Sequence, residues 1–472
     1  MSATAGPGVE VIALETPTLG DRSYLAHDGE VAAVIDPQRD IDRVLDLASA
    51  RKVRITHVFE THLHNDYVTG GLALALATGA AYHVNAADEV AFDRVPVSDG
   101  DVIDLSPVMQ TRVLATPGHT FTHLSYVLQA GGRAHTVFTG GSLLYGSTGR
   151  PDLLGRAHAG ELAHAQFASA HRLAAELPED TSVYPTHGFG SFCSATQSEG
   201  TFSTIGRERR INPALILEED RYVRELLAGL DAYPAYYTHM GPANAAGPSG
   251  PDLSAPRRAH AAELSKRIAA GEWVVDLRAR RAFAAGHLPG ALGFDLDGNF
   301  ATYLGWLIPW GTPLTLLGQT REQVAEAQRE LVRIGIDRPA AAAAGRPRDW
   351  AGGRPLRSYP VADFADLAAA RRHRPVVILD VRRGSEWDSS HIAGAMHVPL
   401  HQLPSRLADV PPGEVWVHCG AGYRASIAAS FLDAAGRTVV AVDDEYDRAA
   451  RAGLPVDGHP ARGGPGRPEV GA

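Results

Sequence analysis

The stretch that decides the first fold is THLHNDYVTGG, residues 61–71. It follows the apolar run ITHVFE, residues 55–60, whose composition predicts a β-strand that ends just before the histidines. His62, His64 and Asp66 can converge on one ion if the segment is an extended loop, because alternate residues of an extended chain point to the same side. The stretch therefore predicts a metal site at the end of a strand.

Two more histidines stand at similar positions further along the chain. His119 follows a Pro-Gly turn in ATPGHTFTH, residues 115–123, and His187 ends a short apolar run in YPTHGFGSF, residues 184–192. Imidazole nitrogens and a carboxylate suit a borderline metal such as Zn²⁺ or Fe²⁺ better than Mg²⁺ or Ca²⁺. The predicted set of metal ligands is His62, His64, Asp66, His119 and His187.

Length and composition limit the class of protein. The 472 residues suffice for about three domains, and 44 Lys and Arg against 54 Asp and Glu give a net charge of −10, which argues against nucleic acid or an anionic membrane as partner. Cys193 and Cys419 are too few for a disulfide framework, and the first residues lack the pattern of a secretory signal. No apolar run reaches the length of about 18 residues that spans a bilayer. We expect a cytoplasmic α/β protein and leave a homo-oligomer open.

Two breaks rich in proline, glycine or alanine divide the chain, at residues 240–258 and 338–355. They predict domains at 8–245, 258–340 and 357–460. The two later domains look like an internal duplication, since both carry an apolar strand, an Asp-x-Arg and a His-apolar-x-Gly-Ala turn.

The loop after Cys419 carries the clearest chemical signal. EVWVHCGAGYRAS, residues 414–426, predicts an apolar strand, a glycine-containing turn and a helix that opens at Ala425 or Ser426. Backbone N–H groups and a helix N-terminus would then face the thiol, stabilise a thiolate or a bound anion, and make Cys419 nucleophilic. Arg424 would add a fixed positive charge for an anionic sulfur donor.

The last domain resembles the rhodanese family. The signatures are LDVRRGSEWDSSHIAGAM, residues 379–396, and VHCGAGYRAS, residues 417–426. The resemblance implies that Cys419 accepts a sulfane sulfur as a persulfide and passes it to a thiol. It further implies that the cradle loop is formed by Gly420, Ala421, Gly422, Tyr423 and Arg424. The middle domain repeats only the first signature and has no cysteine, so a scaffolding role is expected for it.

The first domain resembles the metallo-β-lactamase fold, in the branch of glutathione hydrolases and persulfide dioxygenases. TGGSLLYGSTGRPDL, residues 139–153, and STIGRERRINPAL, residues 203–215, strengthen this resemblance. It implies a single iron(II) held at the positions of His62, His119 and Gly141. Gly141 has no side chain, and Ser142 and Asp152 do not replace the missing carboxylate. Tyr67 stands where the hydrolases have a histidine for a second metal, so a two-metal hydrolase is disfavoured.

Arg150 and Cys193 stand near the predicted ligands in the sequence motifs. Arg150 is a candidate for binding a substrate carboxylate such as that of glutathione, with a structural ion pair to Asp152 as the alternative. Cys193 is expected to be a small buried residue rather than a second nucleophile, because no base or glycine loop adjoins it.

Together these features predict an αββα metallo-β-lactamase-like sandwich followed by two rhodanese-like α/β domains with central parallel sheets. The expected function is sulfane-sulfur metabolism, with sulfur transfer at Cys419 and a persulfide dioxygenase-like first domain. The expected partners are low-molecular-weight thiols, persulfides and thiosulfate, and the expected cofactor is one metal ion, iron(II) before zinc. Two alternatives stay open: a mononuclear zinc thioester hydrolase, and a metal-free first module on a sulfur carrier.

Overall fold

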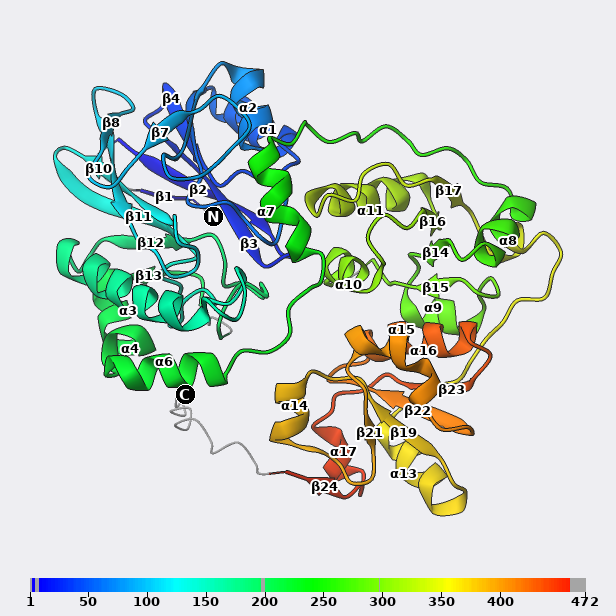
Figure 1. The fold of residues 1–472 in the computed structure, drawn as a ribbon. Coiled ribbons are helices and arrows are strands. Elements are labelled where there is room, and N and C mark those ends of the chain that lie inside the picture. Colours follow the sequence, from blue (N-terminus) through cyan, green and yellow to red (C-terminus); the bar gives the residue numbers. More distant parts are fainter. Residues whose placement is uncertain (1, 5–7, 197–199, 297, 459–472) are drawn as a thin grey trace, which may run out of the picture. The chain divides into compact units, whose positions relative to one another are not determined.

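The fold is taken from a computed structural model that describes residues 2–4, 8–196, 200–296 and 298–458 (Figure 1). The chain forms two compact units. Unit 1 comprises Met1–Leu253 together with Ala301–Gly305 and Gln328–Asp337, and unit 2 comprises Ser254–Phe300, Trp306–Ala327 and Arg338–Ala472. The ranges of the three domains predicted from the sequence remain predictions.

Unit 1 contains two β-sheets. The first has seven strands in the order β1 to β7, antiparallel from β1 to β4 and parallel from β4 to β7. Its strands are β1 Ser2–Thr4, β2 Glu10–Thr16, β3 Asp21–His27, β4 Val31–Ile35, β5 Arg54–Phe59, β6 Ala81–Asn85 and β7 Val95–Val97. The second sheet has the order β13-β12-β11-β10-β9-β8. Its strands are β8 Val102–Asp104, β9 Met109–Ala115, β10 Leu124–Ala130, β11 Arg133–Gly140, β12 Ser182–Pro185 and β13 Ser203–Thr204.

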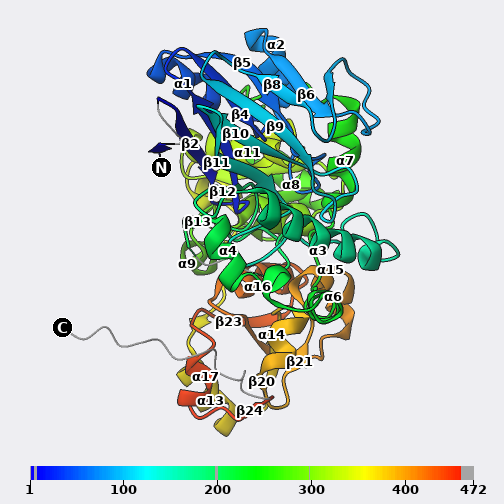
Figure 2. The ribbon, with the colours of Figure 1, turned by 90° about the vertical axis from the view of Figure 1, so that its left-hand side faces the viewer.

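Helices cover the outer faces of both sheets. They are α1 Asp42–Arg51, α2 Gly71–Thr78, α3 Ala159–Glu176, α4 Ile205–Ile211, α5 Pro213–Ile216, α6 Glu219–Ala228 and α7 Tyr237–Ala246. Figures 1 and 2 show α1 and α2 beside the first sheet and α3, α4 and α6 beside the second.

Three apolar cores hold these layers together. Between the sheets, Tyr24 and Phe59 pack in one cluster with Tyr126 and Phe138. One outer core joins α1 and α2 to the first sheet, and the other joins α3 and α6 to the second. Burial of apolar surface on both faces of each sheet is what fixes the αββα order of layers, and it confirms the predicted fold class.

Unit 2 contains two parallel sheets, of orders β15-β14-β16-β17 and β18-β23-β22-β19-β21, and a small pair β20-β24. The strands are β14 Trp273–Asp276, β15 Leu292–Gly293, β16 Leu314–Gly318, β17 Ala341–Ala344, β18 Val361–Ala362, β19 Val377–Asp380, β20 His391–Ile392, β21 Met396–His397, β22 Glu414–His418, β23 Thr438–Val442 and β24 Val456–Asp457. The helices are α8 Ala261–Ala269, α9 Arg280–Ala285, α10 Phe300–Leu307, α11 Arg321–Arg333, α12 Pro347–Ala351, α13 Phe364–His373, α14 Gly384–Ser389, α15 Leu403–Arg406, α16 Tyr423–Ala434 and α17 Arg448–Arg451. The middle parts of α10 and the end of α11 belong to unit 1.

The two copies of the internal duplication make the same contacts around a buried arginine. In the first copy Arg278 binds the Asp276 carboxylate at 2.6 Å and the carbonyl oxygen of Gly286 at 2.9 Å. In the second copy Arg382 binds Asp380 at 2.7 Å and the carbonyl oxygen of Ser390 at 2.6 Å. Both arginines are nearly inaccessible to solvent, so each carboxylate is neutralised inside the protein.

The histidines of the two copies repeat each other as well. His287 stacks on Phe283 with ring centroids 4.0 Å apart, and His391 stacks on Trp387 at 3.8 Å. Each ring also makes a hydrogen bond through Nδ1 to the carbonyl oxygen of the residue on which it stacks. The two copies therefore share one structural frame. Among the described helices, none is both long and apolar enough to cross a membrane.

The replacement of Arg278 or Arg382 by methionine is expected to lower the free energy of unfolding of unit 2 by about 3–5 kcal/mol, because it leaves a buried aspartate without its partner. Tryptophan fluorescence during urea denaturation measures this effect. All six tryptophans lie in unit 2: Trp273, Trp306, Trp310, Trp350, Trp387 and Trp416.

The control is Arg346→Met, since the side chain of Arg346 is 85% exposed and its ion pair with Asp349 should contribute less than about 1 kcal/mol. Unfolding curves of the Arg278 and Arg382 variants that coincide with that of the control would contradict the duplicated structural role.

Candidate functional site

The candidate metal ligands of unit 1 come together where several strands end. His62 and His64 lie in the loop after β5, His119 follows β9, and His187 follows β12. None of these histidines is more than 1% exposed, and neither is Asp66. The structure thus brings the five predicted ligands into one buried region.

Three of the four histidines have the same arrangement around the ring. Nδ1 of His62 lies 2.9 Å from the Thr61 hydroxyl, and Nδ1 of His119 lies 2.9 Å from the carbonyl oxygen of Arg150. Nδ1 of His187 lies 2.9 Å from the Asp21 carboxylate. Because every Nδ1 has a partner, each Nε2 is left to point into the cluster.

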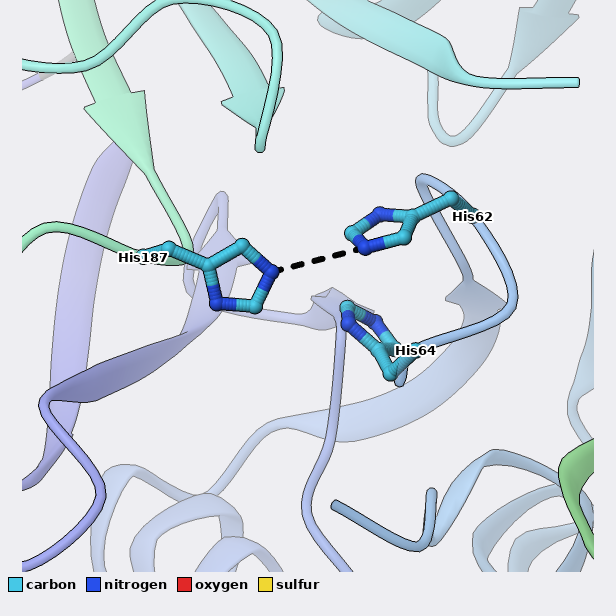
Figure 3. Close-up of side chains that lie close together, drawn as sticks. All are labelled: His62, His64 and His187. Atoms are coloured by element: carbon cyan, nitrogen blue, oxygen red, sulfur yellow. Dashed lines mark hydrogen bonds between the residues drawn. The ribbon is translucent and has the colours of Figure 1, made fainter. Parts of the chain in front are cut away.

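The Nε2 atoms meet in the interior. Those of His62 and His187 are 3.4 Å apart (Figure 3). The ring of His119 has its centroid 4.9 Å from that of His62 and 5.3 Å from that of His187. Within the described part of the chain, Nε2 of His119 has no hydrogen-bond partner. A buried nitrogen without a partner costs free energy unless it binds a ligand.

His64 differs from these three histidines. Its Nε2 lies 3.3 Å from a carboxylate oxygen of Asp36 and 3.3 Å from one of Glu60. Burial by itself would lower the pKa of His64, but the two carboxylates raise it to about 9. Its ring also stacks on Tyr67, at a centroid distance of 4.3 Å. His64 is therefore the charged partner of two buried acids.

Asp66 and Asp21 flank His187. Nδ1 of His187 lies 3.2 Å from Asp66 and 2.9 Å from Asp21. Burial by itself would lower the pKa of His187, but the carboxylates of Asp66 and Asp21 raise it to about 10. Burial, aided by the charge of Asp66, raises the pKa of Asp21 to about 7. Asp66 therefore orients His187 through Nδ1, the nitrogen that faces away from the other Nε2 atoms.

The position of Gly141 is filled by a neighbour. A Cβ atom built on Gly141 would lie 2.3 Å from Cδ2 of His119, which is far below van der Waals contact. The N–H of Gly141 donates to Nε2 of His123 at 3.0 Å, and Nδ1 of His123 contacts Thr116 at 3.0 Å. The ring of His119 thus takes the space that a carboxylate side chain at 141 would need.

Cys193, which the sequence predicts only as a small buried residue, lies beside two of the histidines. Its sulfur and the ligand nitrogens of His119 and His187 lie within 4.8 Å of one another. Burial raises the pKa of the Cys193 thiol well above its usual value, and the charges of Asp66 and Asp21 raise it further. Cys193 is buried, as predicted, and it also offers sulfur to the cluster. The only signal in the sequence was its place in the loop that begins at His187.

The cysteine loop of unit 2 has the predicted form. Cys419 to Gly422 join β22 to α16, and the helix begins at Tyr423, two or three residues before the predicted start at Ala425 or Ser426. Gly422 has φ +85°, and a Cβ there would lie 2.1 Å from the carboxylate of Asp443, so only glycine fits. Cys419 is 2% exposed.

Arg424 holds the loop in place. Its guanidinium pairs with both carboxylate oxygens of Glu386, at 2.5 and 2.7 Å. Burial would raise the pKa of Glu386, but the hydrogen bonds and charge of Arg424 lower it to about 2. Anion binding by Arg424 therefore remains a prediction, while the structure assigns its guanidinium to Glu386.

The cysteine-less copy lacks the loop as well as the cysteine. Only Gln319 and Thr320 lie between β16 and α11, whereas four residues lie between β22 and α16. The N–H of Gln319 donates to the side chain of Gln323 at 2.7 Å.

Arg150 makes the ion pair that was its structural alternative. Its guanidinium donates to Asp152 at 2.7 and 2.9 Å and to the carbonyl oxygen of Asp231 at 2.6 Å. It also lies over the ring of Tyr233, 4.7 Å from the centroid. Binding of a substrate carboxylate by Arg150 remains a prediction.

The histidine cluster of unit 1 and the cysteine loop of unit 2 both lie in segments that match known protein families. Residues 19–187 match the metallo-beta-lactamase superfamily and residues 363–450 match the rhodanese-like domain. The mitochondrial persulfide dioxygenase ETHE1 of Homo sapiens is 32% identical over 216 residues, which is 44% of this chain and 74% of that protein. The chain belongs to the metallo-beta-lactamase superfamily, in the family of ETHE1. The predicted fusion of a persulfide dioxygenase-like domain with a rhodanese-like domain is confirmed.

One further protein sequence and one solved structure are also similar to this chain. A hydroxyacylglutathione hydrolase of Polaromonas sp. is 34% identical over 165 residues, but this covers only 34% of the chain and 57% of that protein. A crystal structure of a metallo-beta-lactamase from Staphylococcus aureus subsp. aureus COL is 25% identical, with a TM-score of 0.64 over 72% of this chain and 100% of its own.

The exchange of Glu386 for glutamine is expected to destabilise unit 2 at neutral pH. A carboxyl group whose pKa is lower in the folded than in the unfolded protein stabilises the fold above its ordinary value near 4.5, and this contribution disappears as the pH falls toward about 2. The difference in melting temperature between wild type and Glu386→Gln should therefore be largest above pH 5 and shrink between pH 4.5 and 2. A difference that is constant over this range would contradict the ion pair with Arg424.

Gly141→Asp, which places a carboxylate where the resemblance implies an iron ligand, is expected to destabilise unit 1 by about 1–3 kcal/mol, because the new side chain overlaps the His119 ring. Thermal unfolding followed by circular dichroism measures the loss. Gly160→Asp is the control, since a Cβ there meets, apart from its chain neighbours and the backbone of its own helix, no atom of the described residues within 4 Å. A Gly141→Asp variant as stable as wild type and filled with iron would show that the ring moves aside freely.

Proposed function

We propose that this protein is a sulfurtransferase of sulfane-sulfur metabolism in which Cys419 carries the transferred sulfur. One observation carries the proposal: Cys419 directly follows the parallel strand β22 and is the first residue of a four-residue loop that leads into the twelve-residue helix α16. The first N–H groups of an α-helix have no partner within the helix and attract an anion. Residues 363–450, which include this loop, match the rhodanese-like domain.

The reaction consists of two displacements at sulfur. The Cys419 thiolate attacks the outer sulfur of thiosulfate, the S–S bond breaks, and sulfite leaves with the bonding electron pair. Cys419 then holds the sulfur as a persulfide. In the second step an acceptor thiolate attacks this outer sulfur, departs with it as a new persulfide, and leaves the Cys419 thiolate with the electron pair. Low-molecular-weight thiols and their persulfides are the proposed acceptors and donors.

The residues around Cys419 have separate tasks in this scheme. The N–H groups of the loop and of the first turn of α16 stabilise negative charge on the thiolate, the persulfide and the arriving donor. Gly422 lets the loop turn beside Asp443. Arg424, bound by Glu386, fixes the beginning of the helix. The low exposure of Cys419 limits access to narrow donors.

Unit 1 is similar to persulfide dioxygenases, but its third metal-ligand position has no carboxylate. Iron, when bound in that family, supplies the chemistry of O₂. Here the third ligand position is Gly141, and the His119 ring occupies its space. The hydrolase alternative is weakened by Tyr67, which is buried against His64 at the place of a second-metal ligand. The proposed activity therefore rests on Cys419.

Cys419→Ser is expected to lower thiosulfate:cyanide sulfurtransferase activity by a factor on the order of 10³ or more, because a serine hydroxyl is not ionised at neutral pH and cannot carry the sulfur. Mass spectrometry of the intact chain after exposure to thiosulfate should show one added sulfur atom in wild type and none in the variant.

The matched control is Gln319→Ala, at the corresponding point of the cysteine-less copy, which should keep wild-type activity. Undiminished turnover of thiosulfate in Cys419→Ser would exclude the proposal, as would a persulfide found only on Cys193.

A further inference from the structure

We propose that the cysteine-less copy takes part in sulfur transfer: Arg280 of that copy binds the sulfonate group of thiosulfate beside Cys419 and so favours sulfonate-bearing sulfur donors. This inference rests on the proposed function and names a donor-binding residue of the same site. It gives the middle copy a role beyond the scaffolding that its sequence predicts.

Two acids tie Arg280 to the cradle loop. Nε of Arg280 donates to Oδ1 of Asp443 at 2.9 Å, and the same oxygen lies 2.1 Å from the place that a Cβ atom on Gly422 would occupy. The backbone N–H of Arg280 donates to the Asp295 carboxylate at 3.1 Å. The Tyr423 hydroxyl donates to the carbonyl oxygen of Asp295, also at 3.1 Å. Arg280 is therefore held next to the point where the loop meets α16.

The charge of Arg280 is felt at the reactive cysteine. Burial by itself would lower the pKa of Arg280, but the carboxylates that bind it raise this pKa, and the charge of the Cys419 thiolate raises it further. The two side chains thus interact electrostatically. A guanidinium in this position attracts an anion that arrives at the cysteine.

The guanidinium of Arg280 keeps N–H groups for a ligand. Among the residues that the structure describes, only its Nε has a hydrogen-bond partner, and Nη1 lies 3.9 Å from the Asp295 carboxylate. The side chain is 31% exposed, so it is open to solvent. In Arg424, by contrast, Nη1 and Nη2 both donate to Glu386. Arg280 therefore has two Nη groups for the bidentate binding of a sulfonate.

The duplicated frame folds without this arginine. Arg280 comes two residues after Arg278 and begins α9, and Gly384 comes two residues after Arg382 and begins α14. The second copy thus forms the same turn with no side chain at the matching position. Arg280 is a feature of the copy without the cysteine alone.

A sulfonate at Arg280 suits the chemistry of thiosulfate. When the Cys419 thiolate attacks the outer sulfur, the S–S bond breaks and its electron pair leaves on sulfite. The guanidinium can pair with two oxygens of the sulfonate before this cleavage and with the departing sulfite during it. A thiol persulfide has no such oxygens. The loss of Arg280 should therefore affect one class of donor and spare the other.

The test compares two donors on variants of the full chain. Thiosulfate carries a sulfonate, whereas the persulfide of mercaptoethanol carries neither a sulfonate nor a carboxylate. Mass spectrometry of the intact chain measures the rate at which one sulfur atom is added, and Cys419→Ser gives the background.

Arg280→Met should lower the second-order rate constant with thiosulfate by a factor on the order of 10–100, because charge-assisted hydrogen bonds to the donor are lost. Most of this loss should be a higher half-saturating concentration of thiosulfate. The rate constant with mercaptoethanol persulfide should change by less than about threefold, since this donor has no group that the arginine binds. The second donor also shows that the variant is folded.

Arg281→Met is the matched control. Arg281 binds the other oxygen of Asp443 at 2.6 Å, but its side chain is 72% exposed, and this variant should react with both donors at wild-type rates. Arg280→Lys keeps the charge and loses the planar pair of N–H groups, so its rate with thiosulfate should lie between those of wild type and Arg280→Met.

Equal losses with both donors in Arg280→Met would overturn the inference, since an arginine that only supports the fold affects every donor. Unchanged thiosulfate rates in Arg280→Met, with no sulfur added in Cys419→Ser, would overturn it as well and leave the proposed function standing. Wild-type protein that takes up no sulfur from either donor would overturn the proposed function and this inference together.

Discussion

The Asp36 carboxylate is the contact on which the site of unit 1 depends. It accepts hydrogen bonds from the N–H and the hydroxyl of Thr61, both at 2.7 Å, and from the hydroxyl of Thr186. Thr61 and Thr186 directly precede His62 and His187 in the sequence. Asp36 lies at the end of β4 with φ +50°, a conformation that a non-glycine residue adopts only when its surroundings hold it there. One buried acid thus joins two sheets and aligns the loops that carry the histidines. Burial would raise the pKa of Asp36, but the charge and hydrogen bond of His64 lower it, so the acid stays ionised.

The sequence predicted the features that follow from strand ends. Apolar runs before His62, His119 and His187 placed these residues at strand-to-loop junctions, and strands of neighbouring sheets end close together in a sandwich. The loop of Cys419 was predictable for a similar reason, since strand, turn and helix follow one another within a short segment. Fold class and fusion followed from the same motifs.

The sequence could not predict which atoms face each other across the interior. His64 and His62 are equivalent in the motif, yet His64 faces Asp36, which follows strand β4, and Glu60, which follows strand β5. Arg424 is predicted to face a substrate, and nothing in the sequence indicated its pairing with Glu386, 38 residues earlier. Cys193 has no motif of its own, and its place beside His119 results from a long loop folding back. Such contacts depend on packing between segments that are distant in sequence.

The two duplicated domains share the contacts that stabilise their fold and differ in the loop that carries Cys419. Both copies keep the buried Asp-x-Arg pair and the stacked histidine, because the sheet depends on them. Only one copy keeps a four-residue loop before its helix, and the other has two residues there. A point mutation that placed cysteine at Gln319 would supply a thiol without the ring of amides around it. A loop like that of Cys419 would require both a cysteine and two inserted residues between β16 and α11. With sulfur transfer proposed at Cys419, the second copy has to keep both its fold and its loop, whereas the middle copy has to keep its fold and can accept changes at the point where the loop would stand.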